Sequence, residues 1–380
     1  MAKKNKKKKI RLQLRKNQQT RTREKDLTRR YETENLDEDK LETRQRVTGK
    51  GDLTRKRTVV GEEVDDGADG TEVVLSVDES VCRPGRVLTA MGLNCSVQDE
   101  QGAVYQCTTR RLLKTLSSDQ RHVVVTGDRV LFQPLGEGEG VIERVEPRRG
   151  ILSRTSRERR HILVANVDQL LIVVSADDPP LKPNLVDRYL ISAEQGGMEP
   201  VVCVNKLDLV NPADLQPLTG LYSQLGYRVL PVCAMTGFGL GRLRGVLKDR
   251  ETVVSGQSGV GKSSLLNAVE SGLGLRVTSV SDDGHKGRHT TTAATLYPLS
   301  FGGYVADTPG IRQFGLWDVV SEEVAGYFRE MRPFINHCRF PNCTHTHEAD
   351  CGVKDAVADM LIDARRYESY LHLLDGDFLE

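Results

Sequence analysis

The residues best suited to phosphate chemistry lie between Gly256 and Ser264, where the sequence reads GQSGVGKSS. The spacing GxxxxGKS follows an apolar run and opens a helical pattern, a context in which backbone N–H groups wrap phosphates at a helix N-terminus. Lys262 would reach the β- and γ-phosphates of a nucleotide, and Ser263 would hold Mg²⁺. We expect nucleotide contacts from the whole loop: Gly256, Gln257, Ser258, Gly259, Val260, Gly261, Lys262, Ser263 and Ser264.

A second motif, Asn205-Lys206-Leu207-Asp208, matches the NKxD pattern that selects guanine. Asp208 would accept hydrogen bonds from the N1 and N2 donors of guanine, while Asn205 holds the loop and the stem of Lys206 covers the base. Adenine would leave the carboxylate unpaired, which is a costly mismatch. The motif therefore predicts GTP rather than ATP as the nucleotide.

Two further segments are candidate switches. Asp307-Thr-Pro-Gly310 closes an apolar run, and we expect Asp307 to hold Mg²⁺ through water and the Gly310 amide to contact the γ-phosphate. The preceding segment GRHTTT offers Thr291 and Thr292 as residues that complete the Mg²⁺ shell and let go after hydrolysis. Spacing does not choose between the two threonines.

The glutamine that usually orients water after DxxG is missing, because Ile311 occupies its place. Hydrolysis is then either slow and assisted by a partner, or driven by another residue. His289 is our candidate catalytic residue, since an imidazole can accept a hydrogen bond from water at neutral pH. An exposed loop histidine without a catalytic role is the alternative that stays open.

The C-terminal part contains a candidate metal site, Cys338-x₄-Cys343-x-His345-x₅-Cys351. Three thiolates and one imidazole form a complete tetrahedral set for structural Zn²⁺ without an open position for catalysis. His337 and His347 are rival imidazoles. We expect one Zn²⁺ per chain.

The motifs come in an unusual order, because NKLD precedes the phosphate loop and DTPG follows it. A circular permutation produces this order without disturbing the folded site, since chain ends usually lie close together on the surface. Apolar strands alternating with helical patterns predict a parallel α/β sheet. We expect these strands at Gln169–Ala176, Pro200–Lys206, Arg228–Ala234, Thr252–Gly256 and Tyr304–Gly310, inside a GTPase domain spanning residues 160–318.

The segments around this domain differ in character. Residues 81–150 contain five short runs of β-branched and aromatic residues, which predict a small OB-like β-barrel that binds RNA. Another small β-barrel is the alternative. Residues 319–380 are helical apart from the cysteine cluster. The predicted fold is thus multidomain: an OB-like barrel, a circularly permuted α/β P-loop GTPase domain and a helical zinc-binding domain.

Charge is distributed unevenly along this 380-residue chain, although its net charge is only +1. Residues 1–30 contain 14 Lys/Arg and 2 Asp/Glu, whereas residues 31–80 contain 7 and 15. We expect residues 1–80 to be a disordered tail, basic and then acidic. The basic part is either a solubilising arm or an arm for nucleic acid. The absence of an apolar signal region or a membrane-length run favours a cytoplasmic protein that does not contact membranes.

These motifs together, NKLD, GQSGVGKSS, GRHTTT, DTPG and the cysteine cluster behind a small barrel, closely resemble the RsgA/YjeQ family of circularly permuted GTPases. The resemblance covers residues 83–370. It implies a GTPase that binds the small (30S) ribosomal subunit and its rRNA, assists late maturation, and hydrolyses GTP to GDP with subunit-stimulated turnover. It also supports His289 as the water-positioning residue. GTP, Mg²⁺ and Zn²⁺ are the implied cofactors, and we expect a monomer. The alternative is a GTP-stabilised rRNA-docking module with little hydrolysis of its own.

Overall fold

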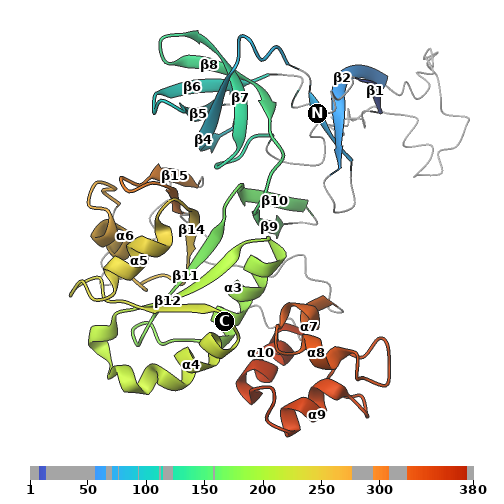
Figure 1. Cartoon of the computed structure of the whole chain (residues 1–380), viewed down its shortest axis with the longest axis vertical. Coiled ribbons are helices and arrows are strands. Elements are labelled where there is room, and N and C mark those ends of the chain that lie inside the picture. The colour runs from blue at the N-terminus through green and yellow to red at the C-terminus, as the bar shows by residue number, and fades with distance from the viewer. Residues whose placement is uncertain are drawn as a thin grey trace, which may run out of the picture.

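The computed structural model describes residues 8–13, 56–65, 71–75, 77–92, 94–110, 113, 123–156, 159–275, 294–307 and 323–374. Figure 1 shows three main bodies: a β-barrel at the top, a sheet covered by helices in the middle, and a cluster of short helices at the lower right. The multidomain fold expected from the sequence is confirmed.

The barrel consists of five strands: β4 (Arg83–Met91), β5 (Asn94–Asp99), β6 (Val104–Thr109), β7 (Arg129–Gly136) and β8 (Glu139–Val145). They follow the order β4-β5-β6-β8-β7, and β7 pairs back with β4 to close the barrel. The β6–β8 pair is parallel, and the other neighbours are antiparallel. Fully buried Val97, Phe132 and Ile142 fill the interior. This closed barrel confirms the expected OB-like domain.

The central sheet contains six strands: β11 (Gln169–Ser175), β12 (Glu199–Asn205), β13 (Arg228–Pro231), β14 (Glu251–Ser255), β15 (Thr295–Pro298) and β16 (Tyr304–Asp307). Their order is β13-β12-β11-β14-β16-β15. Only β15 runs antiparallel to its neighbour in this sheet. The five strands that we expected are thus parallel to one another, and β15 is a sixth strand that we did not expect.

Four helices cover the two faces of the sheet: α3 (Pro183–Gln195), α4 (Gln216–Gln224), α5 (Leu240–Leu247) and α6 (Lys262–Val269). Side chains alternate between the faces of a strand. Leu170 and Ile172 therefore pack with α3 and α4, whereas Leu171 and Val173 pack with α5 and α6. Because both faces are covered, every residue of β11 is buried, which explains its continuous apolar sequence.

The C-terminal helices are α7 (Val324–Tyr327), α8 (Arg332–Ile335), α9 (Gly352–Ala358) and α10 (Ala364–Leu374). Buried Phe328, Met331 and Val353 form their core, which Ile191 of α3 also joins. The helices therefore pack against the GTPase-like sheet domain as well as against one another. Among the helices that the structure describes, none has the length and apolar character needed to cross a bilayer.

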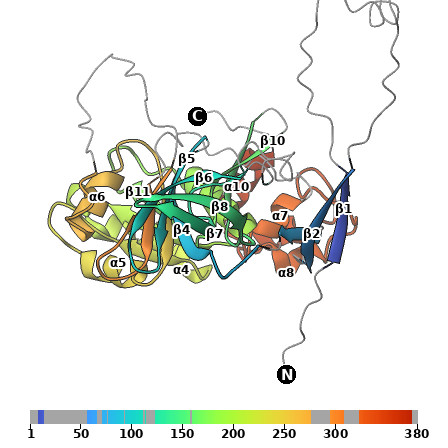
Figure 2. The same ribbon diagram turned by 90° about the horizontal axis from the view of Figure 1, so that it is seen from above.

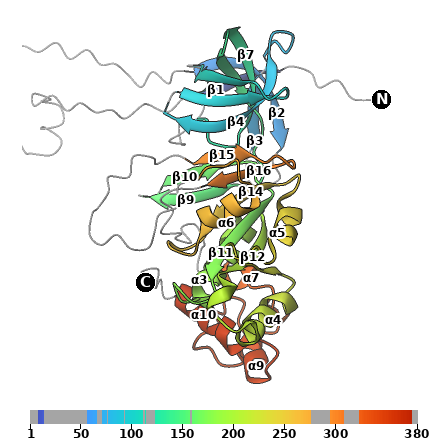
Figure 3. The same ribbon diagram turned by 90° about the vertical axis from the view of Figure 1, so that its left-hand side faces the viewer.

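The barrel is attached to the edge of the central sheet. Thr89 of β4 pairs with Thr295 of β15, which lies directly beneath the barrel in Figure 3. The Thr126 hydroxyl donates to the Ala294 carbonyl at 2.8 Å. A hairpin of β9 (Leu152–Ser156) and β10 (Arg159–Val164) leads from the barrel to β11.

The N-terminal region differs from our expectation of a tail without regular structure. It contains an antiparallel sheet of β1 (Lys8–Gln13), β2 (Lys56–Asp65) and β3 (Thr71–Leu75), which lies beside the barrel in Figures 1 and 2. The runs TVVGEEV and TEVVL are rich in β-branched residues, and this preference outweighs the high charge on which the expectation rested. These three segments form strands, whereas we expected no regular structure from residues 1–80. The rest of residues 1–76 lies outside the described part.

Candidate nucleotide and metal sites

The central sheet brings three motifs together at the carboxyl ends of its parallel strands. Asn205 ends β12, Gly256 follows β14, and Asp307 ends β16. These strands are parallel, so their carboxyl ends meet at the same side of the sheet, where open α/β sheets bind ligands. The motifs therefore lie together in the fold, although their order along the chain is permuted.

At two points of the phosphate loop a Cβ would clash with a neighbouring segment, so that glycine is required there. Gly256 has φ 147°, and a Cβ there would lie 2.0 Å from the carbonyl oxygen of Val173. Gly261 has φ 87°, and its Cβ would lie 2.7 Å from Nδ2 of Asn205. The loop thus runs against both the neighbouring strand and the NKLD segment, and any side chain at these positions would push it away.

Lys262 is the first residue of α6, and its amine folds back over the loop. Nζ donates to the carbonyl oxygens of Gly256 and Gln257, each at 2.8 Å. Ser263 and Ser264 follow in the first turn of the helix and are half-buried. A cation is thereby placed at a helix N-terminus, whose free N–H groups and dipole favour anions.

The NKLD segment leaves β12 through a left-handed residue, Lys206, whose φ is 61°. Asn205 is 1% exposed and connects three loops. Its Nδ2 donates to the Val260 carbonyl at 2.9 Å, and its Oδ1 accepts from the Ala234 N–H at 3.2 Å. Asp208 lies in the short 3₁₀ helix η2 (Leu207–Leu209) and is exposed. The amide of Asn205 is thus buried and holds neighbouring loops together, whereas the carboxylate of Asp208 lies at the surface.

Two contacts of the NKLD side chains were not predicted from the sequence. The Lys206 amine donates to the carbonyl of Asp178, in the loop after β11, and Ser175 Oγ donates to the same oxygen at 2.8 Å. The Cys233 thiol donates to Asp208 Oδ1 at 3.0 Å. The sequence indicated only that Cys233 lies near the end of an expected strand, Arg228–Ala234.

Four of the predicted site residues, His289, Thr291, Thr292 and Gly310, lie outside the residues that the structure describes. Their roles therefore rest on the sequence. Asp307, the last residue of β16, is described and half-buried at the edge that carries the phosphate loop.

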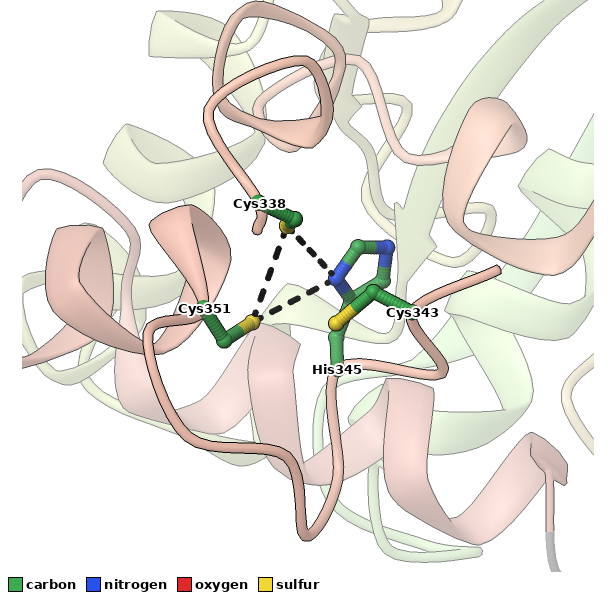
Figure 4. Close-up of side chains that lie close together, drawn as sticks. All are labelled: Cys338, Cys343, His345 and Cys351. Carbon is green, nitrogen blue, oxygen red and sulfur yellow. Dashed lines mark hydrogen bonds between the residues drawn. The ribbon is translucent and has the colours of Figure 1, made fainter. Parts of the chain in front are cut away.

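The four metal-ligand candidates lie together in the C-terminal domain, with their side chains pointing toward one another (Figure 4). Nδ1 of His345 is 3.4 Å from the sulfurs of Cys338 and Cys351, which are 3.9 Å apart. All four candidate ligand atoms lie within 4.8 Å of one another. A zinc ion about 2.3 Å from each sulfur separates tetrahedral sulfurs by about 3.8 Å, so the group fits a tetrahedral Zn²⁺.

The segment between Cys343 and Cys351 is held by hydrogen bonds that orient the cluster. His345 has a positive φ of 58° and is 3% exposed. Its carbonyl accepts from the Tyr367 hydroxyl at 2.7 Å, and the Thr344 carbonyl accepts from Tyr370 at the same distance. Both tyrosines belong to α10, so this helix fixes the turn that carries the imidazole.

The rival imidazoles point elsewhere. Nδ1 of His347 lies 3.0 Å from the Thr346 hydroxyl, and the ring of His337 packs edge-on against Phe334. Burial raises the pKa of the Cys343 thiol to about 12 and lowers the pKa of His345. A neutral imidazole presents a lone pair to a metal, and a bound cation would displace the thiol protons. The chemistry of the donor set therefore suits zinc.

Comparisons with known proteins match this architecture. Residues 145–317 match the model of the RsgA GTPase family. The chain is 39% identical over 303 residues to the small ribosomal subunit biogenesis GTPase RsgA of Sodalis glossinidius, covering 77% of this chain and 85% of that protein. The chain belongs to the RsgA GTPase family. A further RsgA protein, from Chromohalobacter salexigens, is 41% identical over 301 residues, covering 77% of this chain and 86% of that protein.

Solved structures of RsgA-like proteins have the same fold. The crystal structure of YjeQ from Thermotoga maritima matches with a TM-score of 0.64 and 36% identity, covering 77% of this chain and 98% of that one. YloQ, described as a circularly permuted GTPase, matches with a TM-score of 0.61 and 28% identity over 79% of this chain and 97% of that one. The circular permutation inferred from the order of the motifs is confirmed.

Proposed function

We propose that this chain is a GTPase that binds the small ribosomal subunit, assists its late maturation, and hydrolyses GTP to GDP and phosphate. The observation that carries the proposal is the hydrogen bond between Asn205 and the Val260 carbonyl, which joins a guanine motif to a phosphate loop. The relatives are named small ribosomal subunit biogenesis GTPase, and we take the cellular process, maturation of the small subunit, from these names.

In this proposal the phosphate loop from Gly256 to Ser264 surrounds the phosphates, and Lys262 neutralises their charge. Asn205 holds the loop while Asp208 reads the guanine edge and the Lys206 stem covers the base. Ser263 would hold Mg²⁺ directly, and Asp307 would hold it through water. When bound, Mg²⁺ would neutralise charge on the β- and γ-phosphates.

The switch residues complete the site. We assign Mg²⁺ contact to Thr291 or Thr292, contact with the γ-phosphate to the Gly310 amide, and orientation of the attacking water to His289. These assignments are supported by the GRHTTT and DTPG motifs of the sequence. The absence of the usual glutamine, whose place Ile311 takes, fits slow basal hydrolysis that a bound partner accelerates.

The outer domains would bind the partner. We propose that Cys338, Cys343, His345 and Cys351 hold one structural Zn²⁺ that stabilises the helical domain, and that the OB-like barrel contacts rRNA. We propose further that the chain acts as a cytoplasmic monomer. A docking module that only binds GTP is not favoured, because the relatives are named as GTPases.

Co-sedimentation with purified ribosomal subunits tests this function. With a non-hydrolysable GTP analogue, the chain should sediment with small subunits and not with large ones, and GDP should weaken that binding. Lys262→Ala should lose the dependence on nucleotide, whereas Lys248→Ala, at an exposed position after α5, should keep it. Equal binding to both subunits, or to neither, would contradict the proposal.

A further inference from the structure

Arg86 of the barrel is buried where the barrel meets the central sheet. The residue is 8% exposed, and its Nη2 donates to the carbonyl of Asn166 at 2.8 Å and to the carboxylate of Glu251. Asn166 lies shortly before β11, and Glu251 is the first residue of β14. One guanidinium of the barrel therefore contacts the beginnings of two neighbouring strands of the sheet.

Other contacts join the barrel to the same ends of these strands. The Tyr304 hydroxyl, on the first residue of β16, donates to Oε1 of Gln98 in β5 at 3.1 Å. Nδ2 of Asn166 donates to the Gly127 carbonyl at 3.1 Å. The phosphate loop and the DTPG motif follow the carboxyl ends of β14 and β16. Arg86 and Gln98 therefore hold these strands at the ends opposite to the candidate nucleotide motifs.

The strand β14 connects the contact of Arg86 directly to the phosphate loop. Its residues from Thr252 to Ser255 are buried, and it pairs with β11 on one side and with β16 on the other. Gly256, the first glycine of the loop, follows at once. A strand that is packed on all sides transmits a displacement from one end to the other, because a close-packed interior has low compressibility.

The ion pair of Arg86 with Glu251 is a poor source of stability. Nε and Nη1 of Arg86 are buried and find no hydrogen-bond partner in the part of the chain that the structure describes. Burial lowers the pKa of Arg86 and raises the pKa of Glu251, so the cost of removing both charges from water exceeds their attraction. Replacement of such a pair by apolar residues of similar volume is often neutral or stabilising. The pair supplies direction instead, since a charged hydrogen bond fixes a geometry that an apolar contact leaves free.

We propose that Arg86 and Glu251 are positioning residues that couple the barrel to the phosphate loop during hydrolysis stimulated by the small subunit. The bound subunit fixes the orientation of the barrel, Arg86 passes this orientation to Glu251, and β14 carries it to the loop that begins at Gly256. The inference rests on the proposed function, in which the barrel contacts rRNA and the subunit accelerates turnover. It adds the residues through which one affects the other.

The test separates stability from coupling by comparing variants of the full chain at saturating small subunits. In Arg86→Met, Glu251 keeps exposed Arg129 as a partner at 3.4 Å, and we expect the melting temperature and the stimulated rate both to fall. In Arg86→Met/Glu251→Met, the apolar pair should restore the melting temperature. The stimulated rate of this double variant should stay about tenfold below that of the unmodified chain, a usual size for a coupling between two sites. GTP affinity, basal turnover and sedimentation with small subunits should be unchanged.

Two further variants complete the test. Glu251→Gln removes the charge and keeps the shape of the side chain, so it should lower the stimulated rate whether or not the double variant folds. Arg144→Met is the matched control, because Arg144 of β8 pairs with Glu146, two residues further along the chain, at 2.7 Å. Its side chain is 17% exposed. This variant loses an ion pair of the barrel region that does not involve Glu251, and it should keep full stimulation.

The outcomes separate the inference from the function on which it rests. If the stimulated rate recovered together with the melting temperature in the double variant, Arg86 and Glu251 would have a purely structural role and the inference would be overturned. Full stimulation in Glu251→Gln, or an equal loss in Arg144→Met, would overturn it as well. Each of these results leaves the GTPase proposal intact. If small subunits failed to stimulate the unmodified chain, the proposed function would fail, and the inference with it.

Discussion

The side-chain amide of Asn205 donates to the backbone carbonyl of Val260, 55 residues further along the chain, at 2.9 Å. This bond joins the NKLD segment, to which we assign the choice of base, to the GQSGVGKS loop, to which we assign the phosphates. The order of the two segments in the chain is reversed relative to an ordinary GTPase, but the contact depends only on the order of strands in the sheet. A permutation therefore preserves the site and changes what is attached to it.

What is attached here is a helical domain that follows β16, the strand ending in Asp307. Arg366 of α10 is 1% exposed and forms ion pairs with Asp187 of α3 and Glu330. Its guanidinium also lies 4.5 Å from the ring centre of Phe328. The helical domain is thus tied to the face of the sheet through a buried, charged contact as well as through the chain.

The guanine motif can be tested by changing its carboxylate. Asp208→Asn should weaken GTP binding by roughly a hundredfold or more, because the amide presents a donor to the donors of guanine. The same change should improve binding of xanthosine nucleotides, whose base offers an acceptor there. Competition binding with both nucleotides measures the switch. Retained GTP affinity in this variant would remove Asp208 from the base-selecting role.

The phosphate loop predicts a sharp contrast between two glycines. Gly256→Ala should cost more than about 2 kcal/mol of unfolding free energy and abolish GTP binding, since the new Cβ would meet the Val173 carbonyl at 2.0 Å. Gly245→Ala on α5 meets nothing within 4 Å and should be neutral or stabilising by about 0.5–1 kcal/mol. Urea unfolding and nucleotide binding measure both variants. A loop that tolerates alanine at position 256 would contradict the geometry.

The metal site predicts one zinc per chain by elemental analysis. Cys351→Ser should release the metal and lower the melting temperature of the helical domain, because structural zinc contributes directly to folding. Cys82→Ser, at a half-buried cysteine outside the cluster, should retain the metal. Chelation of the unmodified chain should reproduce the effect of Cys351→Ser. A full zinc content in Cys351→Ser would rule out this ligand set.

Two adjacent arginines provide a paired test of the domain contact. Arg366→Ala removes the buried guanidinium that contacts Asp187 and Glu330, and we expect a loss of about 3–5 kcal/mol. Arg365 is exposed and pairs only with nearby Asp363, so Arg365→Ala should cost less than about 1 kcal/mol. Chemical unfolding monitors both. Similar losses in the two variants would show that the buried contact does not hold the domains together.

The same contact predicts a pH dependence. Burial raises the pKa of Asp187 above its ordinary value of 3.8, against the opposing effect of Arg366. The folded state therefore binds this proton more tightly than the unfolded state, and its contribution to stability falls as the pH rises from 3.8 through the raised value. Asp187→Asn cannot ionise, so its unfolding free energy should fall less over this range. Urea titrations at several pH values give the slopes, and equal slopes would refute the assignment.

Much of the fold could be predicted from local sequence. The strand β11 is a continuous apolar run because it is covered on both faces, and β12, β14 and β16 lead into motifs with a recognisable spacing. The strand β15 was missed, since its four residues TLYP end in proline and carry little pattern of their own. The N-terminal sheet was missed because charge was given more weight than β-branched content.

Tertiary contacts between distant segments could not be predicted in this way. The ion pair of Arg366 with Asp187 and the hydrogen bond of Cys233 with Asp208 join residues far apart in the sequence. Each depends on how two elements pack, and a single arginine or cysteine has no local signature of such a contact. The spacing of the cysteine cluster is local, and here the structure brings the expected four residues together.

The most direct test of the account is GTP turnover with and without purified small ribosomal subunits, with large subunits as the control. We predict slow turnover by the chain alone, strong stimulation by small subunits, and loss of the stimulated rate in His289→Ala. Turnover that small subunits leave unchanged, or that large subunits stimulate equally, would contradict the proposal that this GTPase acts on the small subunit.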